Sequence, residues 1–177
     1  MNFVDRVLKW LEIPINIMMW GGLIAGFLMM MHVTVDVTGR TVFNHPFAGT
    51  TEIVSGWYMV AAAYLPWAWI ARSDGHILVD LFTRAASPRV LAILDVLVKL
   101  LTIAWVSVFT WQTFIRAVQQ TRAGEVWEAA GGFIPIWPSR WMLPLAGGLM
   151  VLYLVLRVVS DIGHHSHRLG TPKVEQV

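Results

Sequence analysis

Two histidines, His32 and His76, are the residues whose type and placement first suggest a cofactor. Histidine is a common axial ligand of haem iron in membrane proteins. His32, however, lies toward one end of the first long apolar segment, whereas His76 lies just beyond the opposite end of the second. If both segments cross a bilayer, a hydrocarbon core of about 30 Å separates the two imidazoles. We therefore predict no haem and no other cofactor.

Other candidates for catalysis or metal binding are few. The sequence has no cysteine, which excludes disulfides, thiolate nucleophiles and Cys-ligated metals. It also lacks the G-x-S-x-G, P-loop, H-E-x-x-H and G-x-G-x-x-G motifs. His164, His165 and His167 could bind a metal ion, although a solvated polar tail accounts for them as well. We predict no catalytic residues, no metal site and no enzymatic activity.

Three charged residues lie where the first two apolar segments face the same side of a membrane. Asp36 and Arg40 are four residues apart, so they can pair on one helical face if the first helix continues that far. Glu52 stands at the start of the second segment, where it complements the helix dipole and where Thr50 or Thr51 could cap the helix. We interpret these charges as structural, because a proton or ion relay needs carboxylates near the membrane middle.

Asp95 and Lys99 are the most deeply placed charges. They are also spaced i, i+4 with the acid first, which favours mutual pairing. They fall in the inner third of a helix that is long enough to bring them near the lipid headgroups. We predict a structural pair or a partner contact here, and rank a role in ion passage below it.

The first apolar segment contains a G-x-x-x-G motif formed by Gly22 and Gly26. Two glycines on one helical face let another helix approach closely, and such packing is a main source of helix association in lipid. We therefore predict helix packing at these glycines. In the second segment, Pro66 removes a helical hydrogen bond and predicts a kink.

The composition indicates that lipid surrounds the elements that carry these residues. Hydrophobic residues make up 56% of the 177 residues and charged residues only 14%, against about 25% charged in an ordinary soluble domain. A helix needs roughly 20 apolar residues to cross a bilayer, and four segments are long enough, at residues 13–35, 53–71, 90–115 and 137–159. We predict an all-α integral membrane protein, with four spans in residues 1–160 and a polar cytoplasmic tail at 161–177.

The distribution of Lys and Arg predicts the orientation, because these residues concentrate on the cytoplasmic side. One side collects Arg6, Lys9, Arg72, Arg84, Arg89, Arg157, Arg168 and Lys173, and the other side has only Arg40, Arg116, Arg122 and Arg140. We therefore expect both termini in the cytoplasm. The net charge of +2 comes with no basic run, so nucleic acid is not an expected partner.

The order of several motifs resembles the small, DctQ-like membrane subunit of the tripartite ATP-independent periplasmic (TRAP) transporters. These motifs are Asp36-x-x-x-Arg40 after the first span, Pro46 to Glu52 opening the second, Arg72-Ser-Asp-Gly-His76-Ile-x-Val-Asp80 closing it, and Ile134-Pro-Ile-Trp137 before the fourth. The resemblance covers roughly residues 5–160. Pro66 departs from the family pattern, in which the second span is usually uninterrupted.

The resemblance implies a secondary transport system of three parts. A soluble binding protein captures an organic acid in the periplasm, a large permease subunit carries it across the bacterial inner membrane with sodium, and the small subunit braces the large one. Gly22 and Gly26 would pack on the large subunit. Other polar residues would fix loop and interface geometry: Asp36, Arg40, Glu52, His76, Asp80, Asp95 and Lys99. Six residues that we expect to face the periplasm form a hypothetical docking rim for the binding protein: Arg116, Gln119, Gln120, Arg122, Glu125 and Glu128.

Two alternatives remain open. The chain could be the membrane anchor of an oxidoreductase that binds haem or quinone, in which case the purified protein would carry a cofactor spectrum. It could also be a small homo-oligomeric channel or exporter in which Asp95 and Lys99 line a path. Transport by this chain alone in liposomes would favour the second alternative.

Overall fold

The computed structural model describes residues 3–45, 47–73, 88–129 and 132–168. Its elements in chain order are α1 (Phe3–Val42), α2 (Thr50–Ile53), the π-helix η1 (Val54–Tyr58), α3 (Met59–Tyr64), α4 (Trp67–Arg72), α6 (Pro88–Ala123), β1 (Val126–Ala129), β2 (Gly132–Pro135), the 3-10 helix η2 (Trp137–Trp141) and α7 (Met142–Arg168). Among these described residues, four segments are long and apolar enough to cross a membrane: Arg6–Val42, Thr50–Arg72, Val96–Ala123 and Trp137–Ser160. The predicted all-α architecture with four membrane helices is confirmed.

Helical structure satisfies the backbone polar groups of these apolar segments without water, as a lipid environment requires. Hydroxyl side chains follow the same rule and donate to carbonyls one turn earlier. Thr34 Oγ1 donates to the Met30 carbonyl at 2.8 Å, and Thr102 Oγ1 donates to the Val98 carbonyl at 2.8 Å. Thr34 and Thr102 therefore lie inside spans without leaving their hydroxyls unsatisfied, whereas the buried Thr110 Oγ1 has no hydrogen-bond partner within the described part of the chain.

The second span is built from several helical pieces, and Pro66 separates two of them. Helix α3 ends at Tyr64 and α4 begins at Trp67, so the predicted interruption of the helix at the proline is confirmed. Beyond the break, the Trp67 ring lies 5.5 Å from the Phe109 ring on α6. The break therefore accompanies a contact between the second and third spans.

Gly22 on α1 lies against this break. A β-carbon built at Gly22 would lie 2.8 Å from Cγ of Pro66, whereas one built at Gly26 would lie 3.9 Å from Cβ of Ala62. The glycines thus admit a neighbouring helix, as the motif predicts. That helix belongs to the same chain, and the expected packing of Gly22 and Gly26 on the large subunit stays a prediction.

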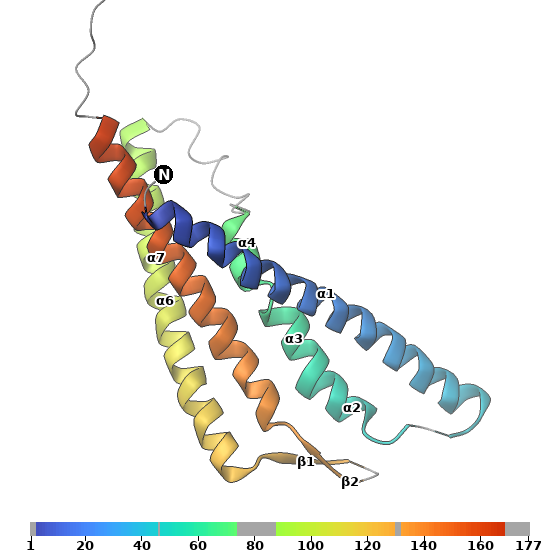
Figure 1. The fold of residues 1–177 in the computed structure, drawn as a ribbon. Coiled ribbons are helices and arrows are strands. Elements are labelled where there is room, and N and C mark those ends of the chain that lie inside the picture. The colour runs from blue at the N-terminus through green and yellow to red at the C-terminus, as the bar shows by residue number, and fades with distance from the viewer. Residues whose placement is uncertain (1–2, 46, 74–87, 130–131, 169–177) are drawn as a thin grey trace, which may run out of the picture.

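The helices form an open arrangement with a small core (Figure 1). Helices α6 and α7 run side by side, while α1 crosses α7 and α4 obliquely and extends away from them. The core comprises Ile15, Ala68, Ala71, Tyr153 and Leu154. Of the residues in the most apolar 18-residue stretch of each span, only 6% are buried in the third span, compared with 33% in the fourth. Most apolar helix faces are therefore covered by something other than this chain.

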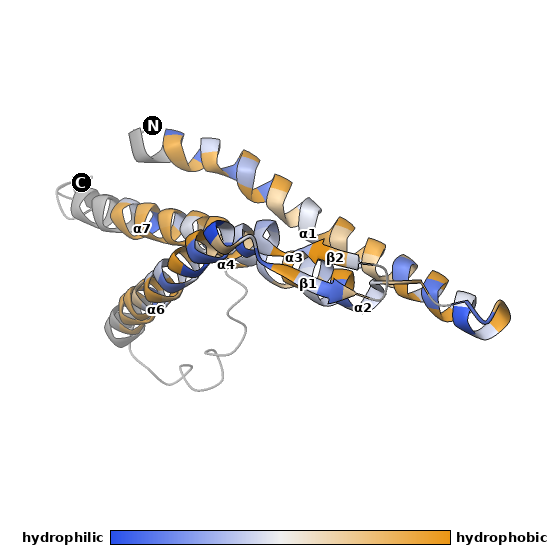
Figure 2. Ribbon diagram, turned by 90° about the horizontal axis from the view of Figure 1, so that it is seen from below, coloured by the Kyte–Doolittle hydropathy of each residue, from blue (hydrophilic) through white to orange (hydrophobic). Residues whose placement is uncertain are grey.

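The two ends of this arrangement differ. Figure 1 shows the start of α1 and the end of α7 at one end, which we name the terminal end. The strands β1 and β2, which we name the outer ribbon, lie at the opposite end, which we name the ribbon end (Figures 1 and 2). The strands pair antiparallel, with Trp127 opposite Ile134 and Glu128 opposite Phe133.

Candidate functional site

The ordered polar contacts at the ribbon end begin with Asp36. Helix α1 continues to Val42, and the Asp36–Arg40 pair forms, with Arg40 Nε donating to Asp36 Oδ2 at 2.9 Å. The other carboxylate oxygen, Oδ1, accepts the Phe47 backbone N–H at 2.9 Å. Asp36 is only 4% exposed. Its carboxylate therefore holds the connection between the first two spans against the end of α1.

The entry to the second span differs from the threonine cap that the sequence suggested. Gly49 occupies the N-cap position with φ 85°, and no side chain caps the helix. Thr50 Oγ1 donates to the Phe47 carbonyl at 3.3 Å instead. A glycine is suited to this position because its left-handed backbone conformation carries no penalty there. Glu52 lies half-buried in the first turn, as predicted for a carboxylate near the positive end of the dipole.

Glu125 is the centre of a second set of contacts, between α6 and α7. Helix α6 ends in a Schellman motif, in which Gly124 has φ 62° and the Glu125 N–H donates to the Gln120 carbonyl at 3.1 Å. The Glu125 carboxylate accepts two hydrogen bonds from Arg140, at 3.0 Å from Nε and 2.7 Å from Nη2. Its carbonyl accepts the Ile136 N–H at 3.0 Å. One residue therefore joins the helix end, the outer ribbon and the fourth span.

The charge-assisted pair also determines the ionisation of Glu125. The hydrogen bond from Arg140 lowers the pKa of this carboxyl below its ordinary value, and the positive charge of the guanidinium acts in the same direction. Partial burial opposes the shift but does not outweigh it. Glu125 is thus held as a carboxylate at neutral pH.

The outer ribbon is fixed to the second span by close contacts with two glycines. A β-carbon built at Gly56 would lie 2.6 Å from Cδ1 of Ile136, and one built at Gly49 would lie 2.7 Å from Cδ1 of Ile134. Ile136 is consequently buried, with 1% of its surface exposed. In addition, Trp57 Nε1 donates to the Pro135 carbonyl at 3.2 Å. These contacts hold the ribbon in one position on the helix.

Gly56 and Trp57 belong to the π-helix η1, the widened turn of the second span. A π-turn inserts one residue into a helix and shifts the directions of the side chains around it, and such turns recur at functional sites. Here the widened turn supplies both the glycine that receives Ile136 and the indole that reaches Pro135. The irregularity of the helix is therefore tied to the position of the ribbon.

Most of the predicted docking rim gathers on the end of α6 and on the ribbon. Arg116, Gln119, Arg122 and Glu128 are exposed, and Gln120 is half-buried. Glu125 departs from this group because Arg140 occupies its carboxylate. The fifteen-residue separation of Arg140 from Glu125 follows no helical spacing, so this pair could not be predicted from the sequence.

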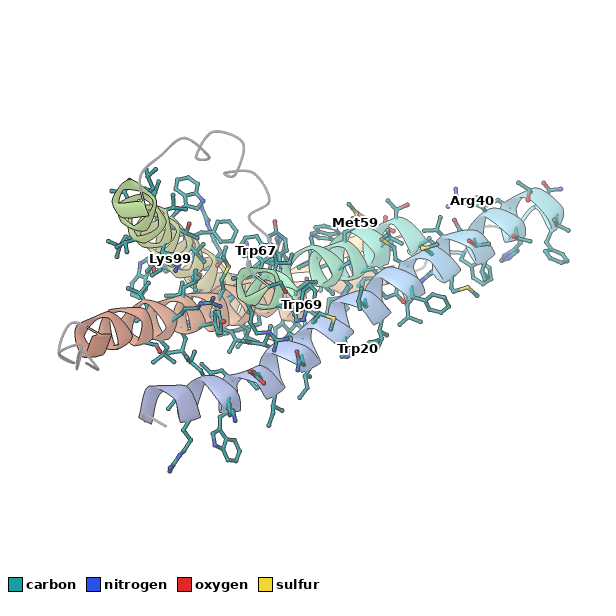
Figure 3. The ribbon with its side chains drawn as sticks, turned by 90° about the horizontal axis from the view of Figure 1, so that it is seen from above. Trp20, Arg40, Met59, Trp67, Trp69 and Lys99 are labelled. Carbon is teal, nitrogen blue, oxygen red and sulfur yellow. The ribbon has the colours of Figure 1, made fainter. Side chains whose placement is uncertain are left out.

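The other predicted polar sites lie elsewhere. His76 and Asp80 fall outside the described residues, as does the side chain of Asp95. Lys99 is half-buried on α6, and Figure 3 shows it well separated from Arg40 near the end of α1. The rings of His32 and Tyr58 meet edge-on, with 5.8 Å between their centroids. Among the described side chains, no group of three His, Cys, Asp or Glu residues could hold a metal ion.

The comparison with protein families decides the class of this molecule. The family described as tripartite ATP-independent periplasmic transporters, DctQ component, matches residues 29–164, well over half of the chain. The chain belongs to the DctQ family. The matched region runs from the middle of α1 into α7 and includes both the Asp36 contacts and the outer ribbon. No curated protein and no solved structure matches the chain significantly.

Membership confirms the resemblance drawn from the sequence motifs. This DctQ chain is a multi-pass membrane protein and the small permease subunit of a TRAP transporter. The DctQ family is a transporter component and not an enzyme family. The contacts at the ribbon end are accordingly interpreted as parts of a transport complex.

Proposed function

We propose that this DctQ component is the small permease subunit of a sodium-coupled TRAP transporter that takes up organic acids across the bacterial inner membrane. It braces the large permease subunit and helps to dock the periplasmic substrate-binding protein. Both termini lie in the cytoplasm, so the ribbon end faces the periplasm.

The bracing role is supported by the apolar helix faces that this chain leaves uncovered. On α6, Trp105 is 74% exposed and Leu101 69% exposed. Lipid or the helices of a larger subunit can cover such faces equally well, because both are apolar. A subunit with a small core and wide apolar faces is therefore suited to enlarging the scaffold of another membrane protein.

The distribution of charge argues against ion transport by this chain alone. The predicted spans 13–35 and 53–71 contain no Asp, Glu, Lys or Arg, and those at 90–115 and 137–159 carry Asp95, Lys99, Arg140 and Arg157 toward their ends. Intramembrane ion paths are ordinarily marked by ionisable residues or by discontinuous helices that bind the ion. The second span is discontinuous at Pro66, but helix α1 packs closely against the break at Gly22. Sodium and solute therefore move through the large subunit.

Reconstitution into proteoliposomes tests this proposal. Uptake of an organic acid should require the large subunit, the binding protein, a sodium gradient and this chain together, and this chain alone should be inactive. Transport by this chain alone would instead favour a homo-oligomeric channel.

In the full system, Arg116→Glu with Arg122→Glu should slow uptake while the complex still assembles. The charge-conserving double variant Arg116→Lys and Arg122→Lys is the matched control. Unchanged uptake in the charge-reversed variant would contradict the hypothesis that these residues form a docking rim.

A further inference from the structure

A polar pocket lies at the ribbon end, where the connection between the first two spans meets the end of α1. Its volume is about 270 Å³, and it is lined by Arg40 and by the six residues from Phe47 to Glu52. We name it the Arg40 pocket. An α-helix with its side chains is about 10–12 Å wide. A space of this volume therefore receives a small charged group and not a helix of another protein.

Arg40 brings a positive charge to this pocket in a fixed orientation. Its Nε donates to Asp36 Oδ2 at 2.9 Å, and Asp36 is held in turn by the Phe47 N–H. The Arg40 side chain is nevertheless 52% exposed, and none of the described residues accepts a hydrogen bond from its Nη1 or Nη2. Figure 3 shows Arg40 near the end of α1. The donors on these two nitrogens therefore remain available for anionic oxygen atoms.

Glu52 brings a negative charge to the same pocket. It is half-buried in the first turn of α2, and no hydrogen bond or ion pair joins its carboxylate to another residue that the structure describes. The helix dipole accounts for the position of a carboxylate in this turn. It does not supply the direct partner that a partly buried charge needs. The pocket therefore offers a cation and an anion to one ligand.

These two charges define the chemical class of that ligand. Arg40 attracts an organic anion but Glu52 repels it, and a metal cation meets the reverse combination. A ligand with an anionic oxygen group and a primary ammonium group a few bonds apart complements both side chains. Such a ligand is a zwitterion, which separates this pocket from a site for an organic acid.

The place of the pocket in the fold favours a lipid as the source of the zwitterion. The second span, Thr50–Arg72, has 23 residues, and a helix needs roughly 20 to cross the hydrocarbon core. Its first turn, with Glu52, therefore lies at a membrane boundary whichever way the chain is oriented. Phe47 lines the pocket and is 51% exposed, and Phe43 at the end of α1 is 73% exposed. These apolar side chains suit the glycerol and acyl parts of a lipid.

We propose that the Arg40 pocket binds the headgroup of a phospholipid that carries a primary amine, such as phosphatidylethanolamine. The phosphate lies on Arg40 and the ammonium group on Glu52. Because Arg40 belongs to α1 and Glu52 to α2, the bound lipid joins the ends of the first two spans. This inference goes beyond the transport function and depends neither on the orientation of the chain nor on a partner subunit.

Native mass spectrometry of the purified full-length chain in detergent tests the headgroup. The probes are phosphatidylethanolamine, phosphatidylcholine and phosphatidylglycerol with identical acyl chains. The quaternary ammonium of phosphatidylcholine has no N–H donor, and phosphatidylglycerol has no ammonium group. Phosphatidylethanolamine should bind about 3- to 10-fold more tightly than either, as expected for one additional, partly exposed charged contact. Equal affinities, or tighter binding of either of the other two lipids, would overturn the inference.

A charge-neutral variant tests whether the pocket is the site. Glu52→Gln keeps the size of the side chain and leaves the Asp36–Arg40 pair in place, and it should abolish the preference for phosphatidylethanolamine over phosphatidylcholine. Glu52→Asp keeps the charge and should retain part of the preference. Glu12→Gln, at an exposed carboxylate near the terminal end, is the matched control and should retain all of it. Circular dichroism checks that each variant is folded, and a preference that survives in folded Glu52→Gln would exclude this pocket.

Soluble phosphoethanolamine distinguishes a lipid from a free zwitterion. It has the same charged groups but no acyl chains, so it should displace phosphatidylethanolamine only at concentrations about 100-fold higher or more, because it lacks the apolar contacts. Displacement at equal concentrations would overturn the lipid as the ligand. None of these measurements requires uptake, so their failure would leave the proposed transport function standing.

Discussion

At the scale of single residues, Glu125 shows that the role of a charged side chain depends on the residue with which it pairs. Its polarity and position suggested a docking residue, but its carboxylate accepts two hydrogen bonds from Arg140. A paired carboxylate of this kind has a structural role, and the place of Glu125 in the docking rim stays a prediction. Arg122 and Glu128 are exposed and remain in the predicted docking rim.

The Glu125–Arg140 pair predicts a particular pH dependence of stability. The pKa of Glu125 is lowered in the folded protein, so its contribution is complete above the ordinary pKa of 4.5 and is lost as the pH falls through the folded-state value. We expect Glu125→Gln to lower the melting temperature at pH 7 and to converge with the wild type in acid. Tryptophan fluorescence of the detergent-solubilised protein measures both curves. Glu128→Gln, at an exposed side chain, is the control, and a pH-independent gap between wild type and Glu125→Gln would contradict the assignment.

At the scale of elements, the break in the second span and the glycine beside it form one structural unit. Pro66 ends a helix that would otherwise continue, and Gly22 lets the proline ring approach the α1 backbone. A G-x-x-x-G motif indicated close packing but not which helix packs there. The sequence could not supply the partner, because any helix with a small or flat surface satisfies the motif.

Alanine substitutions separate the two glycines of this motif. Gly22→Ala places a methyl group 2.8 Å from Cγ of Pro66, so the helices must move apart, at a cost of about 1–3 kcal/mol. Gly26→Ala meets its nearest neighbour at 3.9 Å, an ordinary contact distance, and should be tolerated. Thermal unfolding in detergent, followed by circular dichroism, measures both variants. Equal stability of the two would mean that the α1 contact with Pro66 is not tight in solution.

At the scale of the whole molecule, the arrangement is that of a membrane scaffold component. The helices bury little of one another, the start of α1 and the end of α7 lie at one end, and the ordered polar contacts described above are concentrated at the other. Such a molecule exposes wide apolar faces to the membrane and presents a structured surface to one aqueous side. This division is consistent with the bracing and docking roles that we propose.

Single-cysteine labelling tests the orientation of the whole chain directly, because the sequence contains no cysteine that would interfere. Cysteine in place of Glu128, on the outer ribbon, should react with a membrane-impermeant maleimide in intact spheroplasts. Cysteine in place of Glu12, near the terminal end, should react only after the membrane is permeabilised. The reverse pattern would place the ribbon in the cytoplasm and exclude the proposed docking.

The features that depend on local chemistry could be predicted from the amino-acid sequence. Apolar length predicted four membrane helices, helical spacing predicted the Asp36–Arg40 pair, and proline chemistry predicted the break at Pro66. Short motifs in order also indicated the family, which the profile match confirms.

The features that join distant parts of the chain became evident only in the folded arrangement. The outer ribbon has strands of four residues, too short for a clear periodic signal, and it is held by contacts with Gly49, Gly56 and Trp57 in another span. Arg140 meets Glu125 because α6 and α7 turn back beside each other. The physical reason is the same for both: a contact between distant residues depends on where the helices pack, which no local spacing specifies.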